Sequence, residues 1–161
     1  MARQRSAGVL LYRHGPGGVE VLLVHPGGPY WRKRDAGAWS IPKGEIDEGE
    51  DARAAAWREF GEELGSPVPD GPAIDLGAVR QRSGKQVTAW AVEGDLDPEE
   101  IESATFTLEW PPRSGQERTF PEVDRAGWFA LEAAHEKLLE AQRPLLDRLV
   151  AALDGDGGAD R

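Results

Sequence analysis

Two short apolar runs near the start of the chain are separated by turn-forming residues. Residues 7–12 and 19–24 are rich in Val and Leu, and residues 14–18 between them contain His, Pro and three glycines. Such a connection between two strand-like runs favours a tight turn. The pattern predicts a β-hairpin, followed over residues 26–38 by a loop rich in Gly, Pro and basic side chains.

Further strand-like segments follow along the chain. Residues 39–42 are compatible with one short strand, and residues 128–129 form a short apolar element. Three more segments carry the alternating or β-branched apolar side chains of strands: residues 74–78, 87–92 and 106–110.

Residues 51–64 carry the pattern of a two-sided helix, which Gly65 and the prolines after it bring to an end. At about 100° per residue, its three central glutamates project within roughly 100° of one another. These are Glu59, Glu62 and Glu63. The opposite side is expected to hold four apolar residues, which are Ala54, Trp57, Phe60 and Leu64.

The C-terminal region repeats Leu at helical spacing on both sides of Pro144, which fits one kinked helix or two helices. Residues 154–161 contain three Gly and three Asp, and we expect them to form a disordered tail. A length of 161 residues suits one domain, which we expect over residues 1–153.

Composition narrows the possible functions. The absence of cysteine excludes disulfides, thiolate zinc sites and a cysteine nucleophile. A formal net charge of −10 opposes binding of nucleic acid, so we expect no nucleic-acid partner. No apolar run reaches the roughly 18 residues that a membrane span needs, so we expect no membrane partner and a cytoplasmic location.

Three neighbouring carboxylates raise one another's pKa, and their ionised forms are stable together only beside cations. Mg²⁺ prefers oxygen ligands and a few carboxylates, and Mn²⁺ is the alternative ion. The helix alone favours a solvated acidic face supported by i,i+4 pairs such as Arg58 with Glu62.

The spacing of residues over the longer segment 44–65 favours the interpretation that the glutamates bind a metal ion. The segment from Gly44 to Gly65 fits G-x5-E-x7-R-E-U-x-E-E-x-G, where U is a bulky apolar residue, here Phe60. This segment resembles the Nudix box, with Ser66 where the family pattern has a further apolar residue. The resemblance implies an α+β fold, a Nudix-type α/β/α sandwich with a mixed β-sheet between helices.

The resemblance also implies roles for individual residues. Glu59, Glu62 and Glu63 would bind divalent ions and serve catalysis, with Glu59 as the provisional base and the backbone carbonyl of Lys43 as a further ligand. Arg58 would orient the carboxylates through Glu50. Relatives often bring one more carboxylate from a distant loop, and among Glu109, Glu117 and Glu122 the chosen candidate is Glu122, whose alternative is a solvated loop acid.

Substrate contacts are predicted around the same segment. Arg32, Arg34 and Lys43 would contact phosphates, and Gly44 would permit a backbone turn. Trp39 is a candidate for stacking on a base, but a packing role is favoured for this residue.

Residues 39–44 also resemble the W-x-x-P-K-G segment of diadenosine polyphosphate hydrolases, which the diphosphoinositol polyphosphate and oxidised-nucleotide branches share. The expected function is therefore cleavage of a diphosphate linkage by water attack on phosphorus. The favoured substrate is a (di)nucleoside polyphosphate or nucleoside triphosphate, a small phosphate-containing molecule. The alternative is a Nudix-fold module that binds a nucleotide without hydrolysing it. An exposed strand edge or the aromatic-rich loop is compatible with a homodimer.

Overall fold

A six-stranded mixed sheet forms the centre of the molecule. The computed structural model describes the backbone of residues 5–159 and the side chains of residues 5–155. The strands lie in the order β4–β5–β1–β2–β8, and β3 pairs with β1. Only β1 and β5 run parallel among these pairs. The strands are β1 (Arg5–Gly15), β2 (Gly18–Pro26), β3 (Lys43–Glu45), β4 (Ala73–Arg80), β5 (Gln86–Glu93) and β8 (Val123–Ala130).

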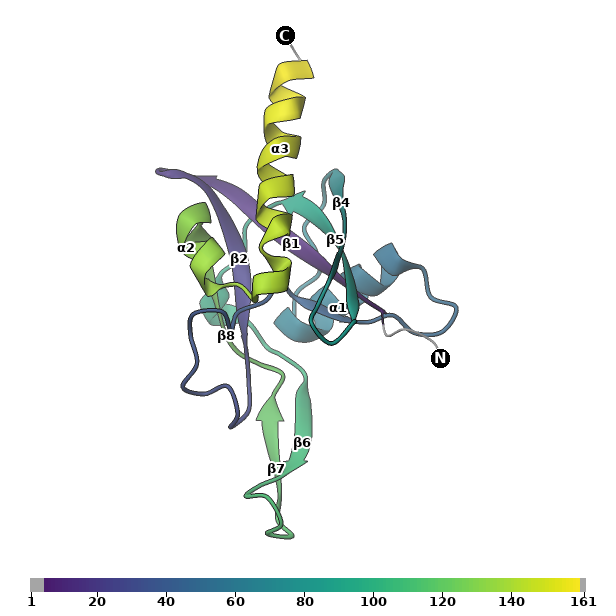
Figure 1. Cartoon of the computed structure of the whole chain (residues 1–161), viewed down its shortest axis with the longest axis vertical. Coiled ribbons are helices and arrows are strands. Elements are labelled where there is room, and N and C mark those ends of the chain that lie inside the picture. Colours follow the sequence, from purple (N-terminus) through teal and green to yellow (C-terminus); the bar gives the residue numbers. More distant parts are fainter. Residues whose placement is uncertain (1–4, 160–161) are drawn as a thin grey trace.

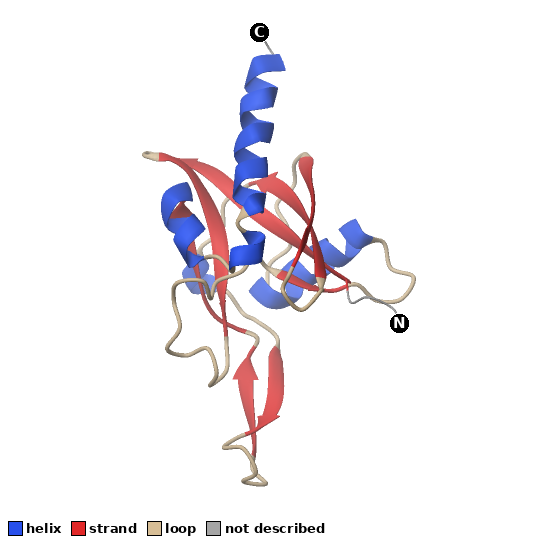
Figure 2. Cartoon of the chain, in the orientation of Figure 1, coloured by secondary structure: helices blue, strands red, loops and turns tan. Residues whose placement is uncertain are grey.

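Helices cover both faces of this sheet (Figures 1 and 2). α1 (Ala52–Leu64) packs on one face, and α2 (Leu131–Lys137) and α3 (Pro144–Ala159) pack on the other. The predicted α+β sandwich with a mixed sheet between helices is confirmed. Among the described residues, no helix is both long and apolar enough to cross a membrane.

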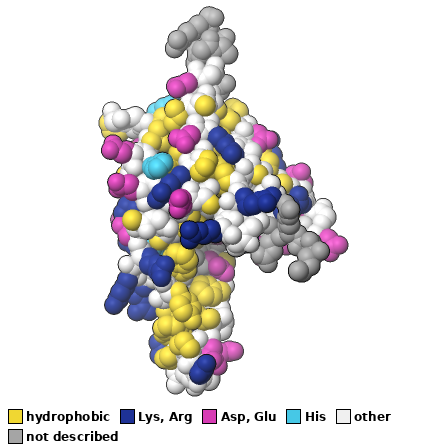
Figure 3. Space-filling model, in the orientation of Figure 1, with side chains coloured by type: hydrophobic (Ala, Val, Ile, Leu, Met, Phe, Trp, Pro, Cys, Tyr) yellow, Lys and Arg dark blue, Asp and Glu magenta, His cyan; other side chains and the backbone are white. Residues whose placement is uncertain are grey.

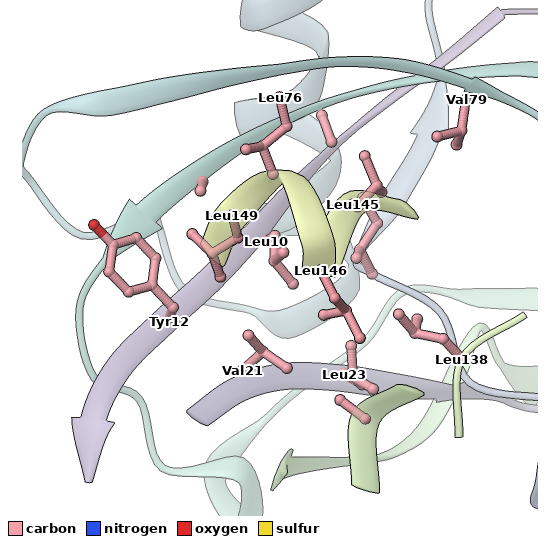
Figure 4. Packing of buried hydrophobic residues seen from close by; sticks show 14 of the residues in the cluster. Leu10, Tyr12, Val21, Leu23, Leu76, Val79, Leu138, Leu145, Leu146 and Leu149 are labelled. Carbon is pink, nitrogen blue, oxygen red and sulfur yellow. The ribbon is translucent and has the colours of Figure 1, made fainter. Parts of the chain in front are cut away.

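The alternation of side chains along β1 explains how one strand serves two cores. Val9 and Leu11 belong to the cluster beneath α1, whereas Leu10 and Tyr12 belong to the cluster beneath α3. Figure 4 shows Leu10 among leucines from α3. Because successive strand residues point to opposite faces, a strand covered on both sides must be apolar at every position. The continuous apolar run at the start of the chain meets this need.

The central helix begins and ends where its sequence has capping residues. The Asp51 side chain accepts a hydrogen bond from the backbone of Ala54, and Gly65 closes the helix with φ 74°. Its buried residues are Ala55, Ala56, Phe60 and Leu64. The prediction that Ala54 is buried was wrong, because the cap places it in the exposed first turn, and Trp57 is only partly buried.

The C-terminal region forms two helices. α2 and α3 are separated by the short 3-10 turn η2 (Glu140–Gln142), and Pro144 is the first residue of α3, where its missing N–H costs nothing. The helix continues to Ala159, so the disordered tail predicted from residue 154 begins as helix, and residues 160–161 lie outside the described part. Leu145, Leu146 and Leu149 pack against the sheet.

A two-stranded hairpin projects from the main body (Figures 1 and 2). It consists of β6 (Thr105–Glu109) and β7 (Glu117–Pro121), which pair with each other and not with the main sheet. The 3-10 turn η1 (Pro98–Glu100) precedes it. The sequence predicted β6 but missed β7, because Glu117, Arg118 and Thr119 are exposed polar residues without a strand-like apolar period.

The strand predicted over residues 39–42 is reduced to two isolated bridges. Trp39 bridges Leu138 and Ser40 bridges Val24. The regular strand β3 starts only at Lys43. This short strand brings the glycine of the box next to α1, and the functional residues gather there.

Candidate functional site

The site is built where β3 passes the C-terminal half of α1. A Cβ atom added to Gly44 would lie 2.0 Å from the carboxyl carbon of Glu59, so only glycine lets this carboxylate approach the strand. Gly44 lies in regular strand pairing with Ala7 and does not have a positive φ. The prediction that Gly44 permits a turn was therefore wrong, and its role is to make room for Glu59.

Glu63 is the most buried acid of the site. Its Oε2 accepts a hydrogen bond of 3.1 Å from the backbone N–H of Lys43. The pKa of Glu63 is raised to about 8, mainly by burial and also by the charges of Glu59 and Glu122, while Lys43 acts in the opposite direction. The pKa of Glu59 is also raised, mainly by burial. The structure thus brings Glu122, distant in sequence, close enough to act on Glu63.

Lys43 provides a positive charge at the same place. Burial lowers the pKa of its ammonium group, and the neighbouring Lys85 lowers it further, while Glu63 and Glu59 act in the opposite direction. The lysine therefore offsets only part of the acidic charge.

Arg58 ties the acidic residues together. Its Nε and Nη2 donate to both oxygens of Glu50 at 2.9 Å each, and Nη1 donates to Glu59 at 2.8 Å and to Glu62 at 3.2 Å. Nη2 also donates to the Glu45 carbonyl at 3.0 Å. This bidentate pairing lowers the pKa of Glu50 to about 2 and raises that of Arg58. Arg58 is thus held where it can orient two of the three central carboxylates.

Glu62 is the most accessible of the three central glutamates. Its side chain is 50% exposed, against 16% for Glu59. Its backbone carbonyl accepts a 2.9 Å hydrogen bond from Ala104, which leads into the β6–β7 hairpin. The end of the acidic helix is therefore fastened to the base of the hairpin.

The donor set suits a hard divalent cation. Carboxylate oxygens at Glu59, Glu62 and Glu63, two of them with raised pKa, are the ligands that Mg²⁺ and Mn²⁺ prefer, and a bound cation would remove their mutual repulsion. Within the described part of the chain, no three acidic or imidazole side chains already surround a common point. Arg58 holds Glu59 and Glu62 in this arrangement, so cation binding requires their side chains to turn.

Comparison with known proteins agrees with this site. The family model described as NUDIX domain matches residues 2–149. The chain belongs to the Nudix family. An RNA pyrophosphohydrolase of Rhodospirillum rubrum is 30% identical over 93% of this chain and 92% of its own length. An 8-oxo-(d)GTP phosphatase of Mycolicibacterium smegmatis is 32% identical over 83% of this chain and 37% of its own length. The chain is accordingly a Nudix pyrophosphohydrolase.

Solved structures show the same fold. The binary complex of a C. elegans Ap4A hydrolase superposes with a TM-score of 0.67 at 24% identity, covering 93% of this chain and 98% of that one. The NUDIX domain of Shewanella oneidensis NrtR, complexed with ADP ribose, gives a TM-score of 0.65 at 17% identity, covering 95% of this chain and 90% of that one.

Three predicted substrate contacts of this Nudix chain lie outside the α1–β3 segment that carries the central glutamates. Trp39 is only 4% exposed and packs edge-on against Phe129, in the cluster on the face of the sheet opposite α1. This burial contradicts a stacking role and fits the packing alternative. Arg32 and Arg34 are exposed in the loop between β2 and β3, and the Arg34 guanidinium lies over the Trp31 ring, 5.7 Å from its centroid.

Sequence reasoning missed the pair that holds this loop. The ring of the fully buried His25 lies 2.8 Å from Asp124 through Nδ1 and 2.7 Å from the Arg34 carbonyl through Nε2. The two side chains are separated by 99 positions, so no local pattern could reveal the contact. The place of His25 directly after the apolar run of residues 19–24 was the one signal in the sequence.

Substituting Arg58 with lysine should reduce kcat about tenfold and change KM little, because lysine has a single nitrogen in place of the planar fork that pairs with both Glu50 oxygens. The apparent affinity for Mg²⁺ should fall as well. Steady-state kinetics with a Mg²⁺ titration measures both. Arg53→Lys is the matched control, since Arg53 on the same helix lies over the Trp57 ring and away from the acids. A normal kcat in Arg58→Lys would show that Arg58 does not position the carboxylates.

Proposed function

We propose that this protein is a Mg²⁺-dependent hydrolase that cleaves a diphosphate linkage in a nucleoside polyphosphate by water attack on phosphorus. The observation that carries the proposal is the close group of Glu59 and Glu63, whose pKa values are raised, beside the exposed Glu62. Such a group is costly for a protein that has no cation to bind.

The proposed role of each acidic residue follows from its structural environment. Glu59, Glu62 and Glu63 would hold the ions, of which Mg²⁺ is the favoured one and Mn²⁺ the alternative. A bound divalent ion supplies charge neutralisation on the phosphates and acidifies water. Glu59 is the proposed base, because Gly44 lets its carboxylate reach the strand edge. Glu122 acts on Glu63 from the loop before β8 and is the proposed additional ligand.

Lys43 has two proposed contributions. Its backbone N–H fixes Glu63, and its ammonium group lies close enough to Glu59 and Glu63 to sense both charges. When the ions bind these acids, the ammonium group becomes available to a phosphate oxygen. Its backbone carbonyl is the proposed further ligand, and Arg58 is the residue that keeps the carboxylates oriented.

The similar proteins support a nucleotide substrate. The curated relatives are named for pyrophosphate or phosphate removal from RNA and from 8-oxo-(d)GTP. We therefore propose nucleoside 5′-polyphosphates, including dinucleoside polyphosphates, as the substrate class.

The test is a panel of substrates with and without divalent ions. Purified protein is incubated with ATP, GTP, 8-oxo-GTP, diadenosine tetraphosphate and 5′-triphosphorylated RNA in Mg²⁺, in Mn²⁺ and in excess EDTA, and products are separated by chromatography. We expect turnover of at least one nucleotide that EDTA abolishes and Mg²⁺ restores. Binding without turnover across the panel would support a nucleotide-binding module instead.

A further inference from the structure

The β6–β7 hairpin has two chemically different faces. Strand pairing sets Phe106 opposite Phe120 and Leu108 opposite Arg118, so these four side chains share one face. We call this the aromatic face. The other face holds Thr107 opposite Thr119 and Glu109 opposite Glu117. Aromatic and basic side chains are thus sorted to one side of the hairpin and acidic side chains to the other.

The loop after β2 extends the aromatic face. Tyr30 is 60% exposed, and its ring packs edge-on against Trp110, 5.3 Å between centroids. Phe106 and Phe120 lie 5.9 Å apart. Figure 3 shows the resulting apolar surface along the projecting hairpin. Within the described residues, Tyr30 and Val150 are the only exposed large apolar side chains, and Val150 lies on α3, away from the projecting hairpin.

The loop and the hairpin are fixed to each other. A Cβ atom on Gly27 would lie 1.9 Å from the Pro121 carbonyl oxygen, and the backbone N–H of Gly27 donates to the Glu122 carbonyl at 2.9 Å. Glycine is therefore required for the loop to press against the hairpin. The aromatic face is held in place before any partner binds.

Positive charge gathers beside this surface. Arg32, Lys33 and Arg34 follow Tyr30 and are exposed, and Figure 3 shows basic side chains next to the hairpin. Arg118 adds a basic group on the aromatic face itself. In a chain of net charge −10, this local pattern favours a partner that is both aromatic and anionic.

The surface starts at the proposed catalytic site. Ala104 donates to the Glu62 carbonyl at 2.9 Å and accepts a 2.8 Å hydrogen bond from the backbone of Glu122. Trp110 follows Ala104 by six residues, about 20 Å at roughly 3.3 Å per strand residue. A chain of several nucleotides is needed to cover that length.

We propose that the aromatic face, with Tyr30 and the basic loop, binds the unpaired nucleotides that follow the 5′-polyphosphate of an RNA substrate. Bases stack on the aromatic side chains, while Arg118 and the loop cations contact the phosphates. The inference rests on the proposed function for the reacting end of the substrate. It departs from the expectation drawn from net charge, because that charge describes the whole molecule and not this surface.

The kinetic test compares a 5′-triphosphorylated RNA hexamer, single-stranded or paired to its complement, with ATP and diadenosine tetraphosphate. Wild-type protein should show a KM for the single-stranded hexamer about tenfold below that for the paired hexamer or ATP. Tyr30→Ala and Arg118→Ala should each remove most of this advantage and leave ATP hydrolysis unchanged. Thr119→Ala, on the opposite face of β7, is the matched control and should behave as wild type.

A binding measurement separates failure of this inference from failure of the proposed function. Fluorescence anisotropy with a labelled hexamer that has a 5′-hydroxyl tests the surface alone, and its affinity should fall in Tyr30→Ala even when no nucleotide is hydrolysed. Unchanged hexamer affinity and KM in both variants would overturn the inference. A Tyr30→Ala effect confined to diadenosine tetraphosphate would also overturn the inference. Conversion of a dimer to a monomer by Tyr30→Ala, measured by light scattering, would overturn it as well.

Discussion

Glu63→Gln should lower kcat by about a thousandfold while making the metal-free protein more stable at alkaline pH. The glutamine keeps an oxygen that can accept the Lys43 N–H, so the fold should persist. It loses the negative charge that the proposed cation requires. Kinetic assays in saturating Mg²⁺ measure the first effect, and urea unfolding in EDTA measures the second.

The pH dependence of the stability gain follows from the raised pKa. The carboxyl of Glu63 ionises at about 8 in the folded protein, against a reference value of 4.5. The wild type therefore loses stability as pH rises through this window, and the full loss is present above pH 8. Glutamine does not titrate, so the variant should gain up to about 5 kcal/mol at pH 8.5 and almost nothing at pH 4.5.

Glu62→Gln is the matched control for this experiment. Glu62 is 50% exposed and pairs with Arg58, so its substitution should reduce kcat by orders of magnitude without the alkaline stability gain. Near-normal turnover in either variant would refute the assignment of these residues as metal ligands. Equal unfolding free energies for wild type and Glu63→Gln at pH 8.5 would refute the buried, raised-pKa state of Glu63.

Gly44→Ala should reduce kcat about a hundredfold. The new methyl group would occupy the position 2.0 Å from the Glu59 carboxyl carbon, so either this carboxylate or β3 must move. Displacement of about 1 Å at a reacting group is enough for such a loss. Circular dichroism and steady-state kinetics together separate misplacement of the carboxylate from unfolding.

Gly17→Ala tests whether this effect is local. Gly17 lies in the turn between β1 and β2, does not have a positive φ, and has nothing within 4 Å of an added Cβ. This variant should retain wild-type rates. A Gly44→Ala protein that is folded and fully active would show that the close approach to Glu59 has no catalytic importance.

Short-range sequence patterns were sufficient to predict much of the fold and the glutamates at the centre of the site. The cap at Asp51, the stop at Gly65 and the spacing of the three glutamates are short-range features, and the structure has α1 with those ends. The apolar run of residues 7–12 predicted strand β1 for the same reason. What the sequence could not supply was the reason for Gly44, because the contact with Glu59 depends on how β3 packs against α1.

Long-range contacts account for the remaining errors. The stacking role considered for Trp39 was wrong, because packing against Phe129, 90 positions along the chain, buries this side chain. Strand β7 was missed because its partner β6, not its own composition, makes it a strand. The influence of Glu122 on Glu63 likewise joins residues 59 positions apart and depends on the tertiary fold.

The separate pairing of β6 with β7 has a consequence for how this scaffold can be redesigned. Since neither strand contributes hydrogen bonds to the six-stranded sheet, the projection can be trimmed or exchanged without opening the ladder that supports β3. Under the proposed function, hydrolysis of the phosphate chain and selection of the group attached to it would depend on physically separable parts of the molecule. Grafting a different hairpin between Ala104 and Glu122 offers a route to new selectivity with the acidic helix left intact.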